Sequence, residues 1–475
     1  MKHASVITTA AICLLLAAHL AAAQQPTPDE TPQQQLQRLS IAVQQAQAQL
    51  EASQRQLLEL QKSLADLQQR LGQPTTPPPD ADIRERQDMQ QSQIATLDQS
   101  KVESDSKYPV KVTGLILLNG FVNTSQVDVA SAPTIAIAGG GSTGASLRQT
   151  ILGVDARGPK LAGAASHADL RVDFFGSPAT STSSATSYAD VGGLLRLRTA
   201  HATLDWNNTQ AFVELDRPIV SPQSPTSLVA VAQPALAWSG NLWSWSPQLG
   251  VSHTLALSPA VHLALEAALI DAPDAPALAS SAVDQAERSR WPGTELHLGL
   301  LGKQDDTGPS VGLGGYFSPH RTGGGTAYNA WAVTTDFRLP LPLDFELSGS
   351  LYRGAALGGL GGGAYKDYLF YSGQVIALDD AGGWAQLKKR IGNRLQFNAA
   401  FGLDNGYASQ LREYDATSST LYQNLARNQT FFANSIYSPS AYLLFSLEVR
   451  HIATIPVTGP AANSNIIGIA AAFKF

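Results

Sequence analysis

The chain has 475 residues and a formal net charge of −6, and charged residues make up 15% of it, below the share of about 25% typical of soluble domains. Its 40 glycines and few charges fit strands that face lipid and turn often. The mild acidity argues against a nucleic-acid partner, which would need a clustered basic surface.

Residues 1–23 have the pattern of a secretory signal peptide. Lys2 precedes an apolar run over 6–18, and Ala21–Ala23 supply the small residues of a cleavage site. The single cysteine, Cys13, lies inside this run, so we expect a mature chain without disulfides or thiol chemistry. No later segment offers about 18 consecutive apolar residues, so we expect no inner-membrane helix. The pattern predicts export to the periplasm, the outer membrane or the exterior.

Residues 36–71 carry a heptad pattern. One apolar series repeats every seven residues, and a second is offset from it by three: Leu36, Val43, Leu50, Leu57, Leu64 and Leu71; Leu39, Ala46, Ser53, Leu60 and Leu67. This pattern predicts a coiled coil, and we assign residues 24–72 to an oligomerisation helix whose strand number stays open. The alternative, one amphipathic helix packed on a globular domain, would need a wider apolar stripe. The proline-rich run 74–80 ends the helix, and we expect residues 73–107 to form a polar linker.

From residue 108 onward, short segments of alternating apolar and polar residues replace the helical pattern, and this period of two predicts β-strands. We predict sixteen strands: 110–122, 148–158, 166–176, 193–206, 208–216, 247–257, 260–271, 293–303, 309–318, 328–339, 343–353, 382–391, 393–403, 428–438, 441–453 and 463–475. Short and long connections alternate between them. An even number of antiparallel strands with short turns at one end is typical of outer-membrane barrels. We therefore predict an all-β transmembrane barrel of about sixteen strands over residues 108–475.

The last predicted strand, 463–475, shows the alternation most clearly. Its apolar face and its opposite face are, in turn, Phe475, Phe473, Ala471, Ile469 and Ile467, and Lys474, Ala472, Ala470 and Gly468. A strand that stops on an aromatic residue resembles the C-terminal signature by which bacterial outer-membrane barrels are recognised for insertion. Many soluble β-domains also end on an amphipathic strand, which is the alternative.

Charged side chains occupy the strand face opposite the apolar one. In the strand 166–176, Leu170 and Val172 would face lipid while the polar residues between them face inward. The charged residues predicted to line the pore are Arg171, Arg196, Arg198, Asp169, Asp173, Glu448 and Arg450. So many ions would not be buried dry, because each unpaired one costs several kcal/mol. A barrel of sixteen strands is wide enough for an aqueous channel, so we predict a water-filled pore.

The connection 217–246 differs from the other long ones. It contains four prolines and a run with three tryptophans: Pro218, Pro222, Pro225 and Pro234, then Trp238, Trp243 and Trp245. Prolines restrict the path of the chain, and indoles bury a large apolar area. We predict that this connection folds into the barrel and narrows it, with Trp243 and Trp245 at the constriction. Packing across the barrel mouth or against a neighbouring subunit is the alternative.

Catalytic patterns are weak by comparison. The runs Gly139–Gly144 and Gly358–Gly363 resemble phosphate loops only superficially, because neither follows a strand and opens a helix, and external loops are the simpler reading. The nine histidines are scattered without metal-ligand spacing. We expect no enzyme activity, no cofactor and no metal.

Several runs together resemble a known family: KVTGLILLNGFV (111–122), GPKLAG (158–163), ADLRVDFFG (168–176), LLRLRTAHATLDW (194–206), GNLWSWSPQ (240–248) and the final FKF. The chain resembles trimeric outer-membrane porins that carry a periplasmic coiled-coil extension, such as the dicarboxylate-type porins. The resemblance implies three associated barrels, a constricting third loop, and basic wall residues that favour anions, matched here by Arg171, Arg196 and Arg198. Asp169 and Asp173 on the same strands depart from simple anion selectivity.

The function expected from these features is passive diffusion of small polar or anionic solutes through the outer membrane. The expected partners are hydrophilic solutes, outer-membrane lipid and two further copies of the chain, with the coiled coil in the periplasm. The alternative is a structural role, in which the coiled coil tethers the barrel to the peptidoglycan.

Overall fold

The computed structural model describes residues 109–176, 193–277, 283–302, 308–414 and 421–475. The chain divides into two units, Met1–Gln87 and Asp88–Phe475, and every described residue belongs to the second unit. The predicted signal peptide, coiled coil and linker lie outside the described residues.

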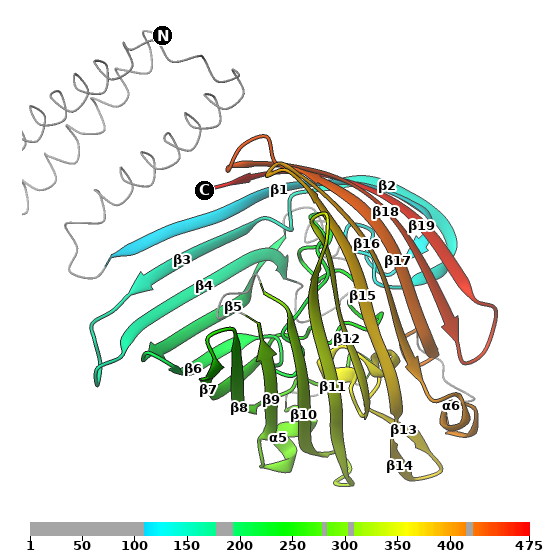
Figure 1. Cartoon of the computed structure of the whole chain (residues 1–475). Helices are drawn as coiled ribbons and strands as arrows, with labels where there is room; N and C mark the ends of the chain where they lie inside the picture. Colours follow the sequence, from blue (N-terminus) through cyan, green and yellow to red (C-terminus); the bar gives the residue numbers. More distant parts are fainter. Residues whose placement is uncertain (1–108, 177–192, 278–282, 303–307, 415–420) are drawn as a thin grey trace, which may run out of the picture. The chain divides into compact units, whose positions relative to one another are not determined.

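Sixteen antiparallel strands form a closed ring, in which each strand pairs with the next along the chain and the last pairs with the first (Figure 1). The ring strands are β1 (Val110–Val127), β3 (Ile151–Arg157), β4 (Ala165–Gly176), β5 (Leu194–Asp205), β6 (Thr209–Asp216), β7 (Ser246–Ser258), β8 (Val261–Ile270), β9 (Gly293–Leu301), β10 (Ser310–Arg321), β11 (Ala327–Leu341), β12 (Phe345–Ala355), β15 (Asp379–Ile391), β16 (Leu395–Gly406), β17 (Leu425–Tyr437), β18 (Leu443–Pro456) and β19 (Ala462–Lys474). Each of the sixteen predicted strands overlaps one of these, so the predicted barrel is confirmed.

A seventeenth strand, β2 (Ala136–Ser146), pairs with the second half of β1, while β3 pairs with the first half. The sequence pattern predicts a loop for this segment, including Gly139–Gly144. That prediction was wrong because a run of glycine and small residues has no apolar face, although its backbone can still pair.

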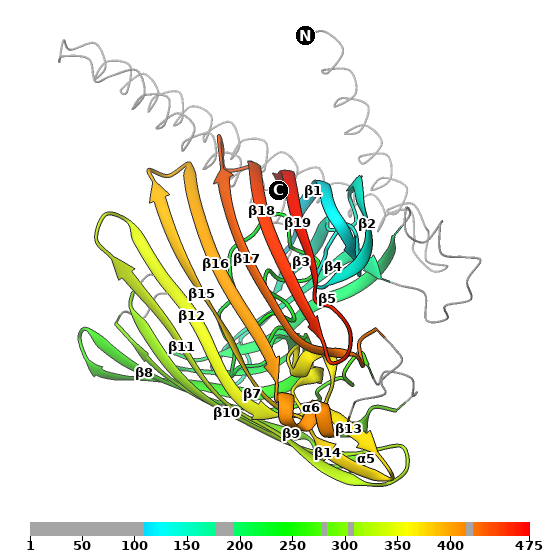
Figure 2. The same ribbon diagram turned by 90° about the vertical axis from the view of Figure 1, so that its right-hand side faces the viewer.

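β1 and β19 close the ring (Figure 2). Gly114 and Phe475 exchange two backbone hydrogen bonds, each 3.0 Å long. On β19, Ile469 is 57% exposed while Ala470 is 5% exposed, so the two predicted faces of this strand are distinct. The outward-facing residue of one strand pairs with an outward-facing residue of the next, as in Leu118 opposite Ala471.

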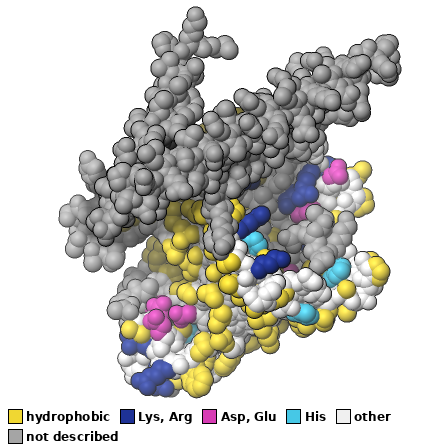
Figure 3. All heavy atoms as spheres, turned by 90° about the vertical axis from the view of Figure 1, so that its left-hand side faces the viewer, with side chains coloured by type: hydrophobic (Ala, Val, Ile, Leu, Met, Phe, Trp, Pro, Cys, Tyr) yellow, Lys and Arg dark blue, Asp and Glu magenta, His cyan; other side chains and the backbone are white. Residues whose placement is uncertain are grey.

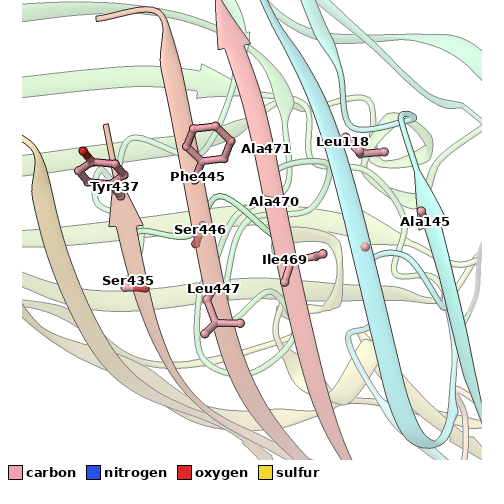
Figure 4. A pocket seen from close by; sticks show the side chains of 11 residues that line it. Leu118, Ala145, Ser435, Tyr437, Phe445, Ser446, Leu447, Ile469, Ala470 and Ala471 are labelled. Atoms are coloured by element: carbon pink, nitrogen blue, oxygen red, sulfur yellow. The ribbon is translucent and has the colours of Figure 1, made fainter. Parts of the chain in front are cut away.

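Large apolar side chains are exposed all round the outer face of the ring. Examples from strands spread over the whole ring are Ile116, Leu170, Val213, Leu249, Leu296, Val333, Leu351, Phe401, Phe431 and Val449. In the space-filling view of one side, charged and histidine side chains lie in patches among hydrophobic ones (Figure 3). A shallow hollow on this outer face, lined by residues such as Leu118, Phe445 and Ile469, lies over β1, β18 and β19 (Figure 4). Such a surface would be unstable in water and suits contact with lipid.

The long connections carry the remaining elements: α5 (Gln285–Ser289), η1 (Gly358–Leu360), η2 (Gly363–Tyr365), β13 (Tyr368–Tyr371), β14 (Gln374–Ala377) and α6 (Ala408–Tyr414). None of the helices in the described part of the chain is long and apolar enough to cross a membrane.

Candidate functional site: the inner wall of the barrel

The connection between β6 and β7, residues 217–245, is hydrogen-bonded to inward-facing side chains of many strands. Both backbone groups of Val220 are used: its N–H donates to Glu295 Oε2 at 3.2 Å, and its C=O accepts from Thr334 Oγ1 at 2.6 Å. Further contacts join Thr226 N to Gln386 Oε1, Asn434 Nδ2 to Thr226 O, Ser227 Oγ to Glu448 Oε2, and Asn428 Nδ2 to Trp238 O. The wall contacts of this connection therefore extend from β9 round to β18.

The stretch 228–232 of this connection is held by β1, by β5 and by the residues between β2 and β3. Its bonds are Asn119 Nδ2 to Val229 O (2.9 Å), Gln149 Nε2 to Val229 O (2.9 Å), Val231 N to Gln149 Oε1 (2.7 Å), Ala232 N to Gln149 Oε1 (2.8 Å), Arg198 Nη1 to Val231 O (2.6 Å) and Arg196 Nη2 to Ala232 O (2.7 Å). The backbone N–H and C=O groups of Val231 and Ala232 therefore all have hydrogen-bond partners on the wall.

Arg196 and Arg198 share the carboxylate of Asp173. Arg196 bonds both oxygens, Nε to Oδ1 at 3.0 Å and Nη2 to Oδ2 at 2.6 Å, and Arg198 Nη1 lies 3.4 Å from Oδ2. Asp173 is fully buried. The two arginines are two residues apart on β5 and so share one face of the strand. A β-bulge lies at Arg198: Thr199 and Leu197 pair with successive residues of β4, and Arg198 between them has no partner. The cluster carries two positive charges against one negative charge.

Trp245 lies beside these guanidinium groups and begins a column of aromatic rings. The ring centre is 4.5 Å from the Arg198 guanidinium and 5.0 Å from that of Arg196, within the range of cation–π contacts. The column continues through Trp243, Trp238, Tyr365 and Tyr422, with centroid separations of 5.3, 6.1, 3.9 and 4.7 Å. Trp238 and Trp243 are buried, so they fix the connection rather than present rings to solvent.

Two histidines on the wall each lie between two carboxylates. His201 Nδ1 is 3.0 Å from Asp169 and its Nε2 is 2.9 Å from Asp216. His297 Nδ1 is 3.0 Å from Glu266 and its Nε2 is 2.8 Å from Asp336. Since an ionised carboxylate only accepts hydrogen bonds, an imidazole between two of them donates from both nitrogens and is positively charged.

Glu448 and Arg450, neighbours on the inward face of β18, form a buried ion pair with Nη2 and Oε1 2.6 Å apart. The second oxygen of Glu448 accepts from Ser227, and Arg450 Nη1 reaches Pro133 O at 3.4 Å. This pair therefore joins two connections to the wall.

A polar hollow of about 270 Å³ lies between the connection and the wall formed by β11, β12 and β15. Its lining includes Gln223 from the connection and a mixed set of charges: Arg338, Glu346, Lys388 and Arg390. Lys388 Nζ lies 2.9 Å and Arg390 Nη2 lies 3.7 Å from Glu346, so one carboxylate faces two cations here.

The connection between β12 and β15 is also packed inward. Asp367 is fully buried and accepts hydrogen bonds from Gly359 N at 3.0 Å and Ala275 N at 3.2 Å. Burial raises the pKa of the Asp367 carboxyl from 3.8 to about 7. Its neighbour Lys366, 2% exposed, donates from Nζ to Gln423 O at 2.8 Å, which links this connection to the one between β16 and β17.

Seven of the nine predicted site residues lie on the connection 217–245 or among its immediate supports: Trp243 and Trp245 on the connection, and Asp173, Arg196, Arg198, Glu448 and Arg450 on the wall around it. Arg171 and Asp169 lie apart from them; Arg171 pairs with Asp155 at 2.5 Å and contacts Asp169 at 3.5 Å. Sequence reasoning missed Gln149, Asn119 and His201 as wall residues. Only the strand alternation could have pointed to Asn119, and nothing local marks Gln149.

No family model and no curated protein matches this chain. Among solved structures it is similar to the outer membrane channel DcaP of Acinetobacter baumannii, with a TM-score of 0.57, 16% identity, and coverage of 78% of this chain and 99% of that chain. Two other matches, the anion-selective porin from Comamonas acidovorans and OprB of Pseudomonas putida, have TM-scores of 0.48 and 0.46 at 10% identity; they cover 78% and 77% of this chain and 100% and 94% of their own. The likeness to DcaP shows that the chain has the barrel fold of a bacterial outer-membrane channel.

Proposed function

We propose that the protein is an outer-membrane porin through which small polar or anionic solutes diffuse down their own gradients. The observation that carries the proposal is a closed ring with an apolar outer face and an inner face lined by ions: Asp155, Asp169, Arg171, His201, Glu346, Lys388 and Arg390. These side chains are not fully buried, so they are in contact with solvent on the inner side of the ring. No covalent chemistry is needed for this function.

We further propose that the connection 217–246 narrows the channel. Its hydrogen bonds to inward-facing side chains from β9 to β18 support this, as do its contacts with Gln149 and Arg198. A rigid segment across a water-filled barrel leaves solutes only the space between the segment and the remaining wall. The polar hollow beside Gln223 and Lys388 belongs to that space.

Charges of both signs around this space create a transverse field that orients dipolar and charged solutes. The cations Arg196 and Arg198, with Arg171 on the neighbouring strand, support a preference for anions. The carboxylates of Asp155, Asp169 and Asp173 reduce it, so we propose weak rather than strict selectivity.

Ion conduction through planar bilayers tests the proposal. The purified full chain should give stepwise currents, and reversal potentials in a salt gradient should show a weak anion preference. A barrel that inserts and remains folded but passes no current would refute the channel function.

The structural alternative, a tether to peptidoglycan through the coiled coil, rests on the heptads at 36–71. A chain lacking residues 24–100 separates the two roles, since a porin conducts without them whereas a tether loses cell-wall attachment. The same heptads, together with the resemblance to trimeric porins, support a homotrimer, which sedimentation in mild detergent would reveal. A monomer there would contradict it.

A further inference from the structure

The chain segment that pairs with β1 is interrupted, so that it forms two strands, β2 and β3, along the length of β1. Asn119 of β1 pairs with Ser146 at the end of β2, and Leu115 pairs with Ile151 at the start of β3. Between these two pairs β1 contributes three residues and its partner contributes four, residues 147–150, so the partner strand carries one extra residue. Extra residues of this kind form β-bulges, which redirect side chains at functional positions.

The backbone N–H groups at this interruption find other hydrogen-bond acceptors, so the interruption is a stable part of the fold. Leu117 N–H, which has lost its ladder partner, donates to Thr150 Oγ1 at 3.1 Å. Thr150 N–H donates to Leu147 O at 3.0 Å and closes a tight turn. Gln149, at the centre of this turn, is completely buried.

The amide of Gln149 uses its full hydrogen-bonding capacity. Nε2 donates to Ser131 O at 3.0 Å and to Val229 O at 2.9 Å, and Oε1 accepts from Val231 N at 2.7 Å and Ala232 N at 2.8 Å. Backbone N–H groups only donate and backbone carbonyls only accept, so the orientation of this amide is fixed. No other residue type offers two donors and two acceptors with this geometry at this length.

We infer that Gln149 is a positioning residue that sets the width of the proposed channel by fixing the stretch 228–232. The inference rests on the proposed function, because only a conducting barrel has a width to set. The stretch lies between two sets of wall contacts, Gln149 with Asn119 on one side and Arg196 with Arg198 on the other. Gln149 and Arg198 both lie at β-bulges of the wall, and both bulges direct a side chain to the stretch 228–232.

Substitutions that keep the size of Gln149 but change its hydrogen bonding test this role. Gln149→Glu retains the two acceptors and loses both donors, placing a carboxylate against the carbonyls of Ser131 and Val229; Gln149→Leu loses all four bonds. Gln126→Leu, on the exposed end of β1, is the matched control. We expect both Gln149 variants to increase single-channel conductance by about 1.5-fold or more, to add open-channel noise, and to admit larger neutral polyethylene glycols, because the narrowest section controls the current. The control should match the parent.

Amide hydrogen exchange gives a second readout that does not depend on conduction. The amides of Val231 and Ala232 should exchange at least about tenfold faster in Gln149→Leu than in the parent, and Asn119→Ala should show a smaller increase in the same stretch. Should the Gln149 variants fail to fold, Asn119→Ala decides the matter. Unchanged exchange together with unchanged conductance in folded variants would overturn the inference. A parent barrel that does not conduct would instead refute the proposed function.

Discussion

The guanidinium of Arg196 donates two hydrogen bonds to the carboxylate of Asp173, of 3.0 and 2.6 Å, and a third of 2.7 Å to the carbonyl of Ala232. Asp173 has no exposed surface, while the side chain of Arg196 is 26% exposed. One arginine thus anchors the connection between β6 and β7 and still presents part of its charge to solvent. In the proposed channel, the effects of Arg196 on shape and on selectivity are therefore expected to be coupled.

Replacing both wall arginines should lower the anion preference of the channel. Arg196→Ala with Arg198→Ala removes two positive charges and leaves Asp173 as an unpaired buried carboxylate, which costs about 3–5 kcal/mol of stability. Reversal potentials in a salt gradient should shift toward cation preference, and the variant should unfold at a lower temperature. Reversal potentials equal to those of the parent would contradict the assignment of these residues.

Replacing Asp173, the carboxylate between Arg196 and Arg198, should raise the anion preference of the channel. Asp173→Asn keeps the shape and one acceptor oxygen but leaves Arg196 and Arg198 without a counter-charge. The reversal potential should move toward stronger anion preference, and the change should shrink in concentrated salt because exposed charge is screened. A shift toward cations would show that Asp173 does not neutralise these arginines.

A methyl group at Gly240 should push the connection off the wall. Gly240 has φ +96°, in the left-handed region, and a Cβ there would lie 2.1 Å from Gly383 O and 2.6 Å from Leu403 O. Because backbone atoms on both strands cannot yield, Gly240→Ala should displace the connection while the ring stays closed. Conductance and noise should rise. Gly315→Ala, where a Cβ meets nothing within 4 Å, is the control and should behave as the parent.

The packing of the connection between β12 and β15 should weaken as the pH rises. The pKa of Asp367 is raised by burial to about 7, above its ordinary value of 3.8, so folding favours the protonated carboxyl. The resulting stabilisation is complete below pH about 4 and is lost as the pH rises through about 7. Protease cleavage within 356–378, measured relative to an unfolded substrate at each pH, should therefore become faster between pH 4 and pH 8.

Asp367→Asn, which has no carboxyl proton to lose, should show a much flatter pH dependence in the same experiment. A parent chain whose cleavage rate does not change over this range would contradict the role of Asp367. Equal slopes in parent and variant would assign the effect to another group.

The sixteen ring strands were predictable because each one separates lipid from a polar interior, so apolar and polar residues alternate along much of its length. β2 was missed because Gly139–Gly144 has almost no side chains to alternate. The bulges at Gln149 and Arg198 shift the register by one residue, and a shift of this kind depends on the facing strand rather than on local pattern.

The tryptophans marked the connection 217–246 as unusual, and its prolines suggested a fixed path. Trp238 stacks on Tyr365, which stacks in turn on Tyr422, and both tyrosines lie more than a hundred residues further along the chain in two other connections. No periodicity links such segments, so the aromatic column could be found only from the three-dimensional structure.

The wall partners of residues 217–245 bear on how the barrel assembles. Glu295, Gln386 and Glu448 belong to strands synthesised after the connection, while Asn119 and Gln149 precede it. A segment that is hydrogen-bonded to strands from both halves of the chain can reach its final position only after the C-terminal strands have joined the N-terminal ones. Completing the wall contacts of this connection and closing the ring therefore depend on the same encounter between the early and the late strands.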